Sequence, residues 1–143
     1  MNKNYVISLV SKVRAEATIF LEKELVKNGI DGLVPSYGSM LSTLYRNNGK
    51  LRMKAVADLI NRDKSTVTHL VNKLSKAGYV VREQSSEDSR EVYVVLTQKA
   101  WEMEEKLKCI SQNLITTAYK GFSEDEKEQL VGLLDKMKNN FKN

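Results

Sequence analysis

The spacing of apolar residues changes abruptly near Gly78, and this change limits the possible folds more than any other feature of the chain. Before it, apolar residues recur at the i, i+3, i+4 and i+7 spacing of a helix with one buried face: Val67, Leu70, Val71 and Leu74. After it, residues 79–81 and 91–96 are β-branched and aromatic and flank a polar stretch. We therefore predict a helix, a left-handed cap at Gly78, and a hairpin with a solvated tip.

A shorter amphipathic helix is predicted just before this one, over residues 53–60. Residues 61–63 form the turn between the two helices, and Asp63 is a suitable N-cap for the second. Two helices joined by a three-residue turn and followed directly by a hairpin are typical of a winged helix-turn-helix. In that arrangement the second helix enters the major groove of DNA.

Long amphipathic helices are predicted on both sides of this lobe. One covers residues 5–27, a second begins at Pro35, a third follows Thr97, and a capping box at Ser123 and Glu126 begins the last. We expect the stripe from Met103 to Ala118, and the last helix's leucines, to be buried. The predicted fold class is mainly α with a small β-hairpin (α+β).

The terminal helices carry more apolar surface than a small lobe can cover, which is typical of contact with another subunit. We therefore expect a single chain over residues 1–143 in which residues 34–97 form the winged lobe. Residues 1–33 and 98–143 would then be the dimerisation helices.

Composition argues against several classes of protein. One Cys, Cys109, cannot form an internal disulfide, and no apolar run is long enough to cross a bilayer, so we expect a cytoplasmic protein and no membrane partner. A single His leaves too few ligands for imidazole and thiolate metal sites or for catalytic triads, so we expect no enzyme activity, no metal and no cofactor. Residues 36–97 carry +4 of the net charge of +5, which favours an anionic partner there.

The exposed face of the predicted second helix has the side chains that base readout requires. The candidate DNA contacts are Ser65, Thr66, Thr68, His69, Asn72 and Lys73. An Asn can read adenine and a Lys guanine. The alternative is an ordinary solvated helix face.

At the hairpin tip, Arg90 could enter a minor groove while Asp88 orients its guanidinium. The alternative at this place is a solvated turn with a weak ion pair.

Several separated stretches resemble one known family. They are residues 66–74, 78–82, 88–91 and 95–97, and in order and spacing they resemble the winged-helix signature of the MarR/SlyA transcriptional regulators. The resemblance covers nearly the whole chain. Two departures are Arg52, where the family often has a capping Thr or Ser, and Trp101, which follows Ala100 where a charged residue is usual.

The resemblance implies a homodimer that binds a pseudo-palindromic double-stranded DNA operator. It also implies a sequence-specific regulator, which we take to be a repressor released by a small aromatic or anionic effector. The alternatives are a winged-helix protein interaction module that does not bind DNA, and an enzyme, which would need a pocket with paired carboxylates.

An effector site could be lined by Tyr37, Met40, Tyr45 and Trp101, although aromatic and Met side chains at helical spacing more often belong to a core. Core packing is also the favoured interpretation for Trp101. Cys109 is interpreted as a small buried hydrophobe in preference to a redox sensor.

Overall fold

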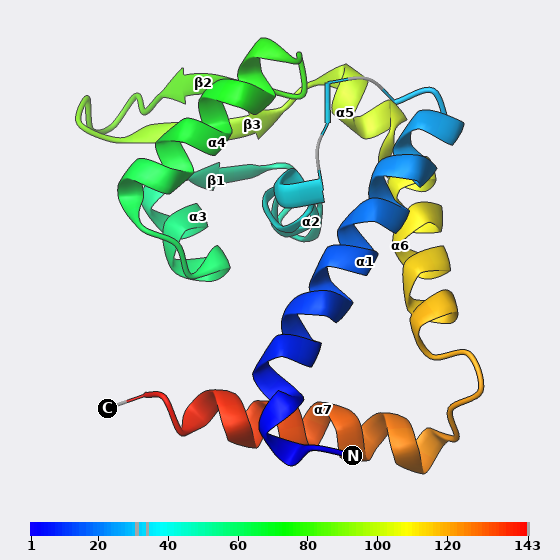
Figure 1. Ribbon diagram of the computed structural model, residues 1–143. Coiled ribbons are helices and arrows are strands. Elements are labelled where there is room, and N and C mark those ends of the chain that lie inside the picture. The colour runs from blue at the N-terminus through cyan, green and yellow to red at the C-terminus, as the bar shows by residue number, and fades with distance from the viewer. Residues whose placement is uncertain (31, 34, 143) are drawn as a thin grey trace.

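A computed structural model describes residues 1–30, 32–33 and 35–142 of the chain (Figure 1). A compact lobe, built from α2 to β3, lies beside a frame of three long helices, and α5 connects the two parts. In chain order the elements are η1 (Lys3–Tyr5), α1 (Val6–Lys27), η2 (Pro35–Tyr37), α2 (Gly38–Arg46), β1 (Lys50–Arg52), α3 (Met53–Ile60), α4 (Lys64–Lys76), β2 (Val80–Gln84), β3 (Val92–Leu96), α5 (Gln98–Glu102), α6 (Glu104–Ala118) and α7 (Glu124–Asn139).

The sheet of the lobe has one more strand than the sequence indicated. β2 and β3 form the expected antiparallel hairpin, and β1 pairs with the other edge of β3, which gives the order β1-β3-β2. β1 places Leu51 opposite Val94. The predicted hairpin is confirmed, and the strand that the prediction missed is β1, because three residues are too short to produce a recognisable alternation.

The two helices of the helix-turn-helix begin and end close to the predicted residues. α3 ends at Asn61, which has the left-handed backbone of a C-cap. The Asp63 carboxylate caps α4 by accepting a hydrogen bond of 2.7 Å from the Thr66 backbone amide. Gly78 has a φ of +87°, so the predicted left-handed cap is confirmed.

The core of the lobe forms where α2, α3 and α4 pack on one face of the sheet. Its members share an exposure of at most 1%: Met40, Leu44, Val56, Val67, Val71, Leu74, Tyr79, Val80 and Val94. The helical spacing of these residues and the alternation along β3 therefore converge on one core. The prediction of a mainly helical winged helix-turn-helix is confirmed.

The helix predicted after Thr97 is interrupted at Met103 and forms α5 and α6. The Thr97 hydroxyl accepts a hydrogen bond from the Ala100 amide at 3.3 Å, and it also lies 2.6 Å from the Gly78 carbonyl, to which it donates. It thus caps α5 and ties this helix to the end of α4. On α6 only Ile110 is buried and Ala118 is exposed, so the expected buried stripe is wrong for the single chain.

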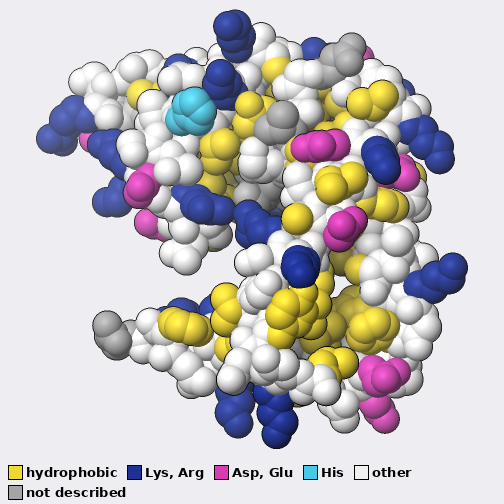
Figure 2. Space-filling model, viewed as in Figure 1, with side chains coloured by type: hydrophobic (Ala, Val, Ile, Leu, Met, Phe, Trp, Pro, Cys, Tyr) yellow, Lys and Arg dark blue, Asp and Glu magenta, His cyan; other side chains and the backbone are white. Residues whose placement is uncertain are grey.

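The frame helices leave much of their apolar surface uncovered. α7 crosses the open ends of α1 and α6, and Figure 2 shows hydrophobic side chains gathered in this region. The predicted capping box of α7 is present. No residue of the helix α7 is buried, however, and Leu133 is 63% exposed. The expectation that these leucines are buried is therefore not met within one chain.

Trp101 lies at the junction of the lobe and the frame. The residue is 38% exposed, and its ring meets that of Tyr45 edge to face, with ring centroids 5.5 Å apart. A Cβ atom on Gly49 would lie 2.5 Å from the indole Cζ2, and Gly49 also has a φ of +80°. The interpretation of Trp101 as a core residue is corrected: it covers a turn that has no space for a larger residue than glycine.

Candidate nucleic-acid interface

One face of α4 presents polar side chains to solvent. Ser65, Thr68, His69, Asn72 and Lys73 are exposed, and Thr66 is half-buried. Figure 2 shows the sole His among Lys and Arg side chains on this part of the lobe. A positive surface with hydroxyl and amide groups has the chemistry needed to contact both phosphates and base edges.

Two of the predicted contact residues, Ser65 and Thr66, also form hydrogen bonds to the N-cap of α4. The Ser65 hydroxyl lies 3.4 Å from the Asp63 carboxylate, and hydrogen bonds from the Thr66 side chain and backbone lower the pKa of Asp63 below its usual value. Asp63 therefore stays ionised and holds the N-terminal turn of α4. The exposed hydroxyl of Thr68 donates to the Lys64 carbonyl at 2.9 Å.

The tip of the wing is an ordered turn. Asp88 Oδ1 accepts the Arg90 backbone amide at 3.0 Å and the Arg90 Nε at 3.3 Å, while the Arg90 side chain remains 88% exposed. The buried Ser85 accepts the backbone amides of Glu87 and Asp88, each at 3.2 Å, through its hydroxyl. The expected Asp88–Arg90 pair is present. It fixes the Arg90 side chain as far as Nε, while the terminal nitrogens of the guanidinium remain exposed to a ligand.

The outer face of the sheet carries an ion-paired network that sequence reasoning missed. The Arg52 Nε lies 2.8 Å from Glu91 and 3.3 Å from the Tyr93 hydroxyl, to which it donates, and Lys50 pairs with Glu83 at 3.0 Å. The ring of Tyr93 also lies 4.6 Å beneath the Lys50 ammonium. No signal in the sequence could locate this network, because it depends on β1.

A second missed residue lies on the α4 side of the sheet. Arg82 of β2 donates a hydrogen bond through Nη2 to Oδ1 of Asn72 on α4. An Asn of the candidate interface is therefore in direct contact with a guanidinium from the wing. The Arg was visible in the sequence, but its reach to α4 depends on the packing of the helix against β2.

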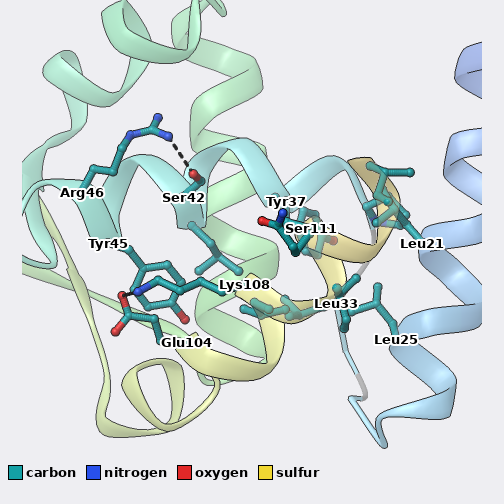
Figure 3. A pocket seen from close by; sticks show the side chains of 17 residues that line it. Leu21, Leu25, Leu33, Tyr37, Ser42, Tyr45, Arg46, Glu104, Lys108 and Ser111 are labelled. Atoms are coloured by element: carbon teal, nitrogen blue, oxygen red, sulfur yellow. Dashed lines mark hydrogen bonds and ion pairs between the residues drawn. The ribbon is translucent and has the colours of Figure 1, made fainter. Parts of the chain in front are cut away.

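A cavity of about 570 Å³ separates the lobe from the frame (Figure 3). Tyr37 and Tyr45 of the predicted effector pocket line it, together with apolar side chains of α1 and α6. Met40 is fully buried in the core and Trp101 lies outside the lining, so these two members of the predicted pocket are corrected.

Polar groups gather at one side of this cavity. Burial raises the pKa of Tyr45 to about 12, aided by the charge of Glu104, and the neutral phenol donates to the Ala100 carbonyl. Arg46 donates to the Ser42 hydroxyl at 2.9 Å, whereas the Lys108 ammonium lies 3.5 Å from Glu104 (Figure 3). The cavity therefore combines apolar walls with both acidic and basic groups.

Cys109 is exposed on α6, so its interpretation as a buried hydrophobe is wrong for the single chain. Within residues 1–30, 32–33 and 35–142, no cluster of three His, Cys, Asp or Glu side chains is arranged to hold a metal ion. In the same part of the chain, no helix is long and apolar enough to span a membrane.

The fold and this surface define a winged-helix protein of the transcription-regulator type, and comparison with known proteins identifies the family. A model of the MarR family matches residues 35–92. The chain is 34% identical to the HTH-type transcriptional regulator YkoM of Bacillus subtilis (strain 168) over 73% of its own length and 68% of that protein. The chain belongs to the MarR family of transcriptional regulators.

Solved structures agree with this assignment. A MarR protein from Peptoclostridium difficile is similar at a TM-score of 0.75 and 26% identity, over 98% of this chain and 88% of that one. A mutant MarR from E. coli complexed with operator DNA has the same fold at a TM-score of 0.79 and 21% identity, over 96% of this chain and 99% of that one. The curated relatives are named as HTH-type transcriptional regulators.

The wing geometry predicts how Asp88 titrates. Hydrogen bonds from the Arg90 backbone, and then from its side chain, lower the pKa of Asp88, so the carboxyl should titrate below the usual value of about 3.9. Arg90→Ala removes only the side-chain bond and should raise the midpoint part of the way. Carboxyl ¹³C shifts followed by NMR against pH measure this, and an ordinary midpoint in the wild-type protein would show that the wing turn is not formed.

Proposed function

We propose that the chain is a sequence-specific, double-stranded DNA-binding repressor that acts as a homodimer on a pseudo-palindromic operator. α4 would lie in the major groove, with Ser65, Thr66, Thr68, His69, Asn72 and Lys73 as the contact set. Arg90, supported by Asp88, would enter the adjacent minor groove. The ordered wing beside an exposed polar α4 is the observation that carries this proposal.

The composition of α4 favours DNA over a protein partner. Its outer face holds hydroxyl, amide, imidazole and ammonium groups, while its apolar residues Val67, Val71 and Leu74 are buried and Leu70 is half-buried. A winged-helix module for protein contacts would be expected to expose apolar side chains there. The likeness to a MarR solved with operator DNA supports the same choice.

Arg90→Ala should weaken binding to duplexes that the wild-type protein enriches from a random pool. Loss of a guanidinium from a narrow minor groove should raise the Kd about tenfold or more and reduce the slope of log K against log salt by about one. Binding measured by fluorescence anisotropy at several salt concentrations tests this.

Arg14→Ala, on the exposed part of α1, removes the same charge outside the lobe and serves as the control. Equal affinities of the Arg90→Ala variant and the wild-type protein at physiological salt would remove the wing from the mechanism.

We propose that the frame forms the dimer, with residues 1–33 and 98–143 as dimerisation segments. The apolar side chains of α7 that a partner would cover lie on one face: Leu130, Leu133 and Leu134 are all exposed in the single chain, as is Phe141 just beyond the end of the helix. A groove between α1 and α6, lined by Val13, Phe20 and Leu114, continues this apolar surface.

Leu134→Asp should shift the protein towards the monomer, because a dimer would bury the new charge in an apolar interface. Gly132→Asp is a matched control on the opposite face of α7, where an added Cβ meets nothing within 4 Å. Analytical ultracentrifugation over a range of concentrations measures both. A Leu134→Asp variant that dimerises as tightly as the wild-type protein would mean that α7 lies outside the interface.

The repressor would be released by a small effector in the cavity between lobe and frame. Apolar walls from Leu25, Leu41 and Ile110 suit an aromatic ring, and Arg46, beside Ser42, provides a cation for an anionic or phenolic group. A ligand that binds better when lobe and frame have moved apart would favour a dimer whose α4 helices are wrongly spaced for DNA.

Benzoate, a small aromatic anion, should lower the affinity for the enriched duplex in a manner that saturates. Ser111→Phe places a bulky side chain at the cavity wall and should suppress this response, whereas Thr116→Phe on the same helix lies outside the lining and should not. Anisotropy titrations compare the three proteins. An undiminished response in the Ser111→Phe variant would locate the effector elsewhere.

A further inference from the structure

The contact between Arg82 and Asn72 joins the wing to the middle of the candidate reading face. Asn72 is exposed on α4, and Arg82 reaches it from β2, the strand that leads into the wing. Among the predicted contact residues within the described part of the chain, only Asn72 has a side chain that is hydrogen-bonded to a side chain from the sheet.

A guanidinium has only donors, so it determines which end of the Asn72 amide faces it. Oδ1 must turn towards Arg82, as it does in the structure, and the Nδ2 amino group is then the end left for a ligand. To hold adenine in the usual bidentate manner, Asn must offer both an acceptor to N6 and a donor to N7. While Arg82 donates to Oδ1, one of the two lone pairs of Oδ1 is occupied and a single lone pair remains for adenine N6, whereas both hydrogens of Nδ2 stay free to donate.

A neighbouring group extends this arrangement of donors. Lys73 is exposed next to Asn72 on α4, and an ammonium group also only donates. In the major groove, guanine offers two acceptors, O6 and N7, whereas adenine offers one acceptor and one donor. A cluster in which donors predominate therefore complements guanine better than adenine, whose amino group needs an acceptor.

The position of Arg82 is held from several sides. It pairs in register with Val94 of β3, its neighbour Glu83 forms an ion pair with Lys50 of β1, and Gln84 donates to the Ser89 carbonyl in the wing. Each of these residues of β2 is thus tied to a different part of the lobe. Arg82 is the one that is directed to α4.

We infer that Arg82 is a specificity-determining positioning residue that orients the Asn72 amide so that Asn72 reads guanine in preference to adenine. The inference rests on the proposed binding of α4 in the major groove. It differs from the expectation from sequence, in which an Asn on this face reads adenine.

The experiment selects duplexes from a random pool with the wild-type protein and with Asn72→Ala, Arg82→Met and Lys76→Met variants, and sequences each pool. The base that faces Asn72 is the symmetric position whose preference disappears in Asn72→Ala. The wild-type protein should prefer guanine there, and Arg82→Met, which keeps the stem length but has no donors, should shift the preference towards adenine by about tenfold or more. Lys76→Met removes one charge from α4 and should weaken binding without changing the preference.

A pool in which Arg82→Met keeps the wild-type preference at every position would overturn the inference, because Arg82 would then contact only phosphate. Adenine at the Asn72-dependent position of the wild-type pool would overturn it as well, as would an unchanged preference in Asn72→Ala. Failure of the proposed function is a different result: the wild-type protein would then enrich no sequence at all. Circular dichroism of each variant checks that the fold is intact.

Discussion

Strand β3 is hydrogen-bonded along both edges, and the arrangement of the lobe depends on this double pairing. On one side it pairs with β1, which leads directly into α3, and on the other with β2, which follows α4. Its inward side chains, Val94 and Leu96, are buried in the core beneath the helices. The helix-turn-helix is therefore attached to β3 both before α3, through β1, and after α4, through β2. The wing is the turn that leads into β3.

The end of β3 also joins the lobe to the frame. The Leu96 amide donates to the Gly49 carbonyl at 2.8 Å. The Thr97 hydroxyl accepts the Ala100 amide in the first turn of α5 and donates to the Gly78 carbonyl just after α4. Tyr45 reaches across from α2 to the Ala100 carbonyl, and Trp101 closes over the Gly49 turn. These contacts lie beside the cavity that Tyr45 lines, so a change in the cavity wall has a short physical route to the positions of α4 and the wing.

Much of the lobe could be predicted from sequence because its signals are local. The spacing of Val67, Val71 and Leu74, the cap at Asp63 and the turn at Gly78 each reflect residues within a few positions of one another. β1, the Trp101 contact with Gly49 and the Arg82 contact with Asn72 join distant segments, and no local pattern encodes them. Met40 and Tyr45 both lie on the apolar side of α2, so the helical period could not distinguish the core residue from the cavity residue.

The basic residues of the lobe fall into two groups, those paired with a carboxylate and those that are not, and the net charge does not distinguish them. On the sheet and wing, Lys50, Arg52 and Arg90 each lie within 3.3 Å of a carboxylate oxygen. On α4, the ion pairs found over residues 1–30, 32–33 and 35–142 include none that involves Lys64, Lys73 or Lys76. A phosphate that approaches α4 therefore need not displace a carboxylate from these ammonium groups, whereas one that approaches the outer face of the sheet meets Glu83 and Glu91. The positive charge that is open to a polyanion lies on the helix with the polar reading face, and the paired charges of the sheet hold the strand that positions the wing.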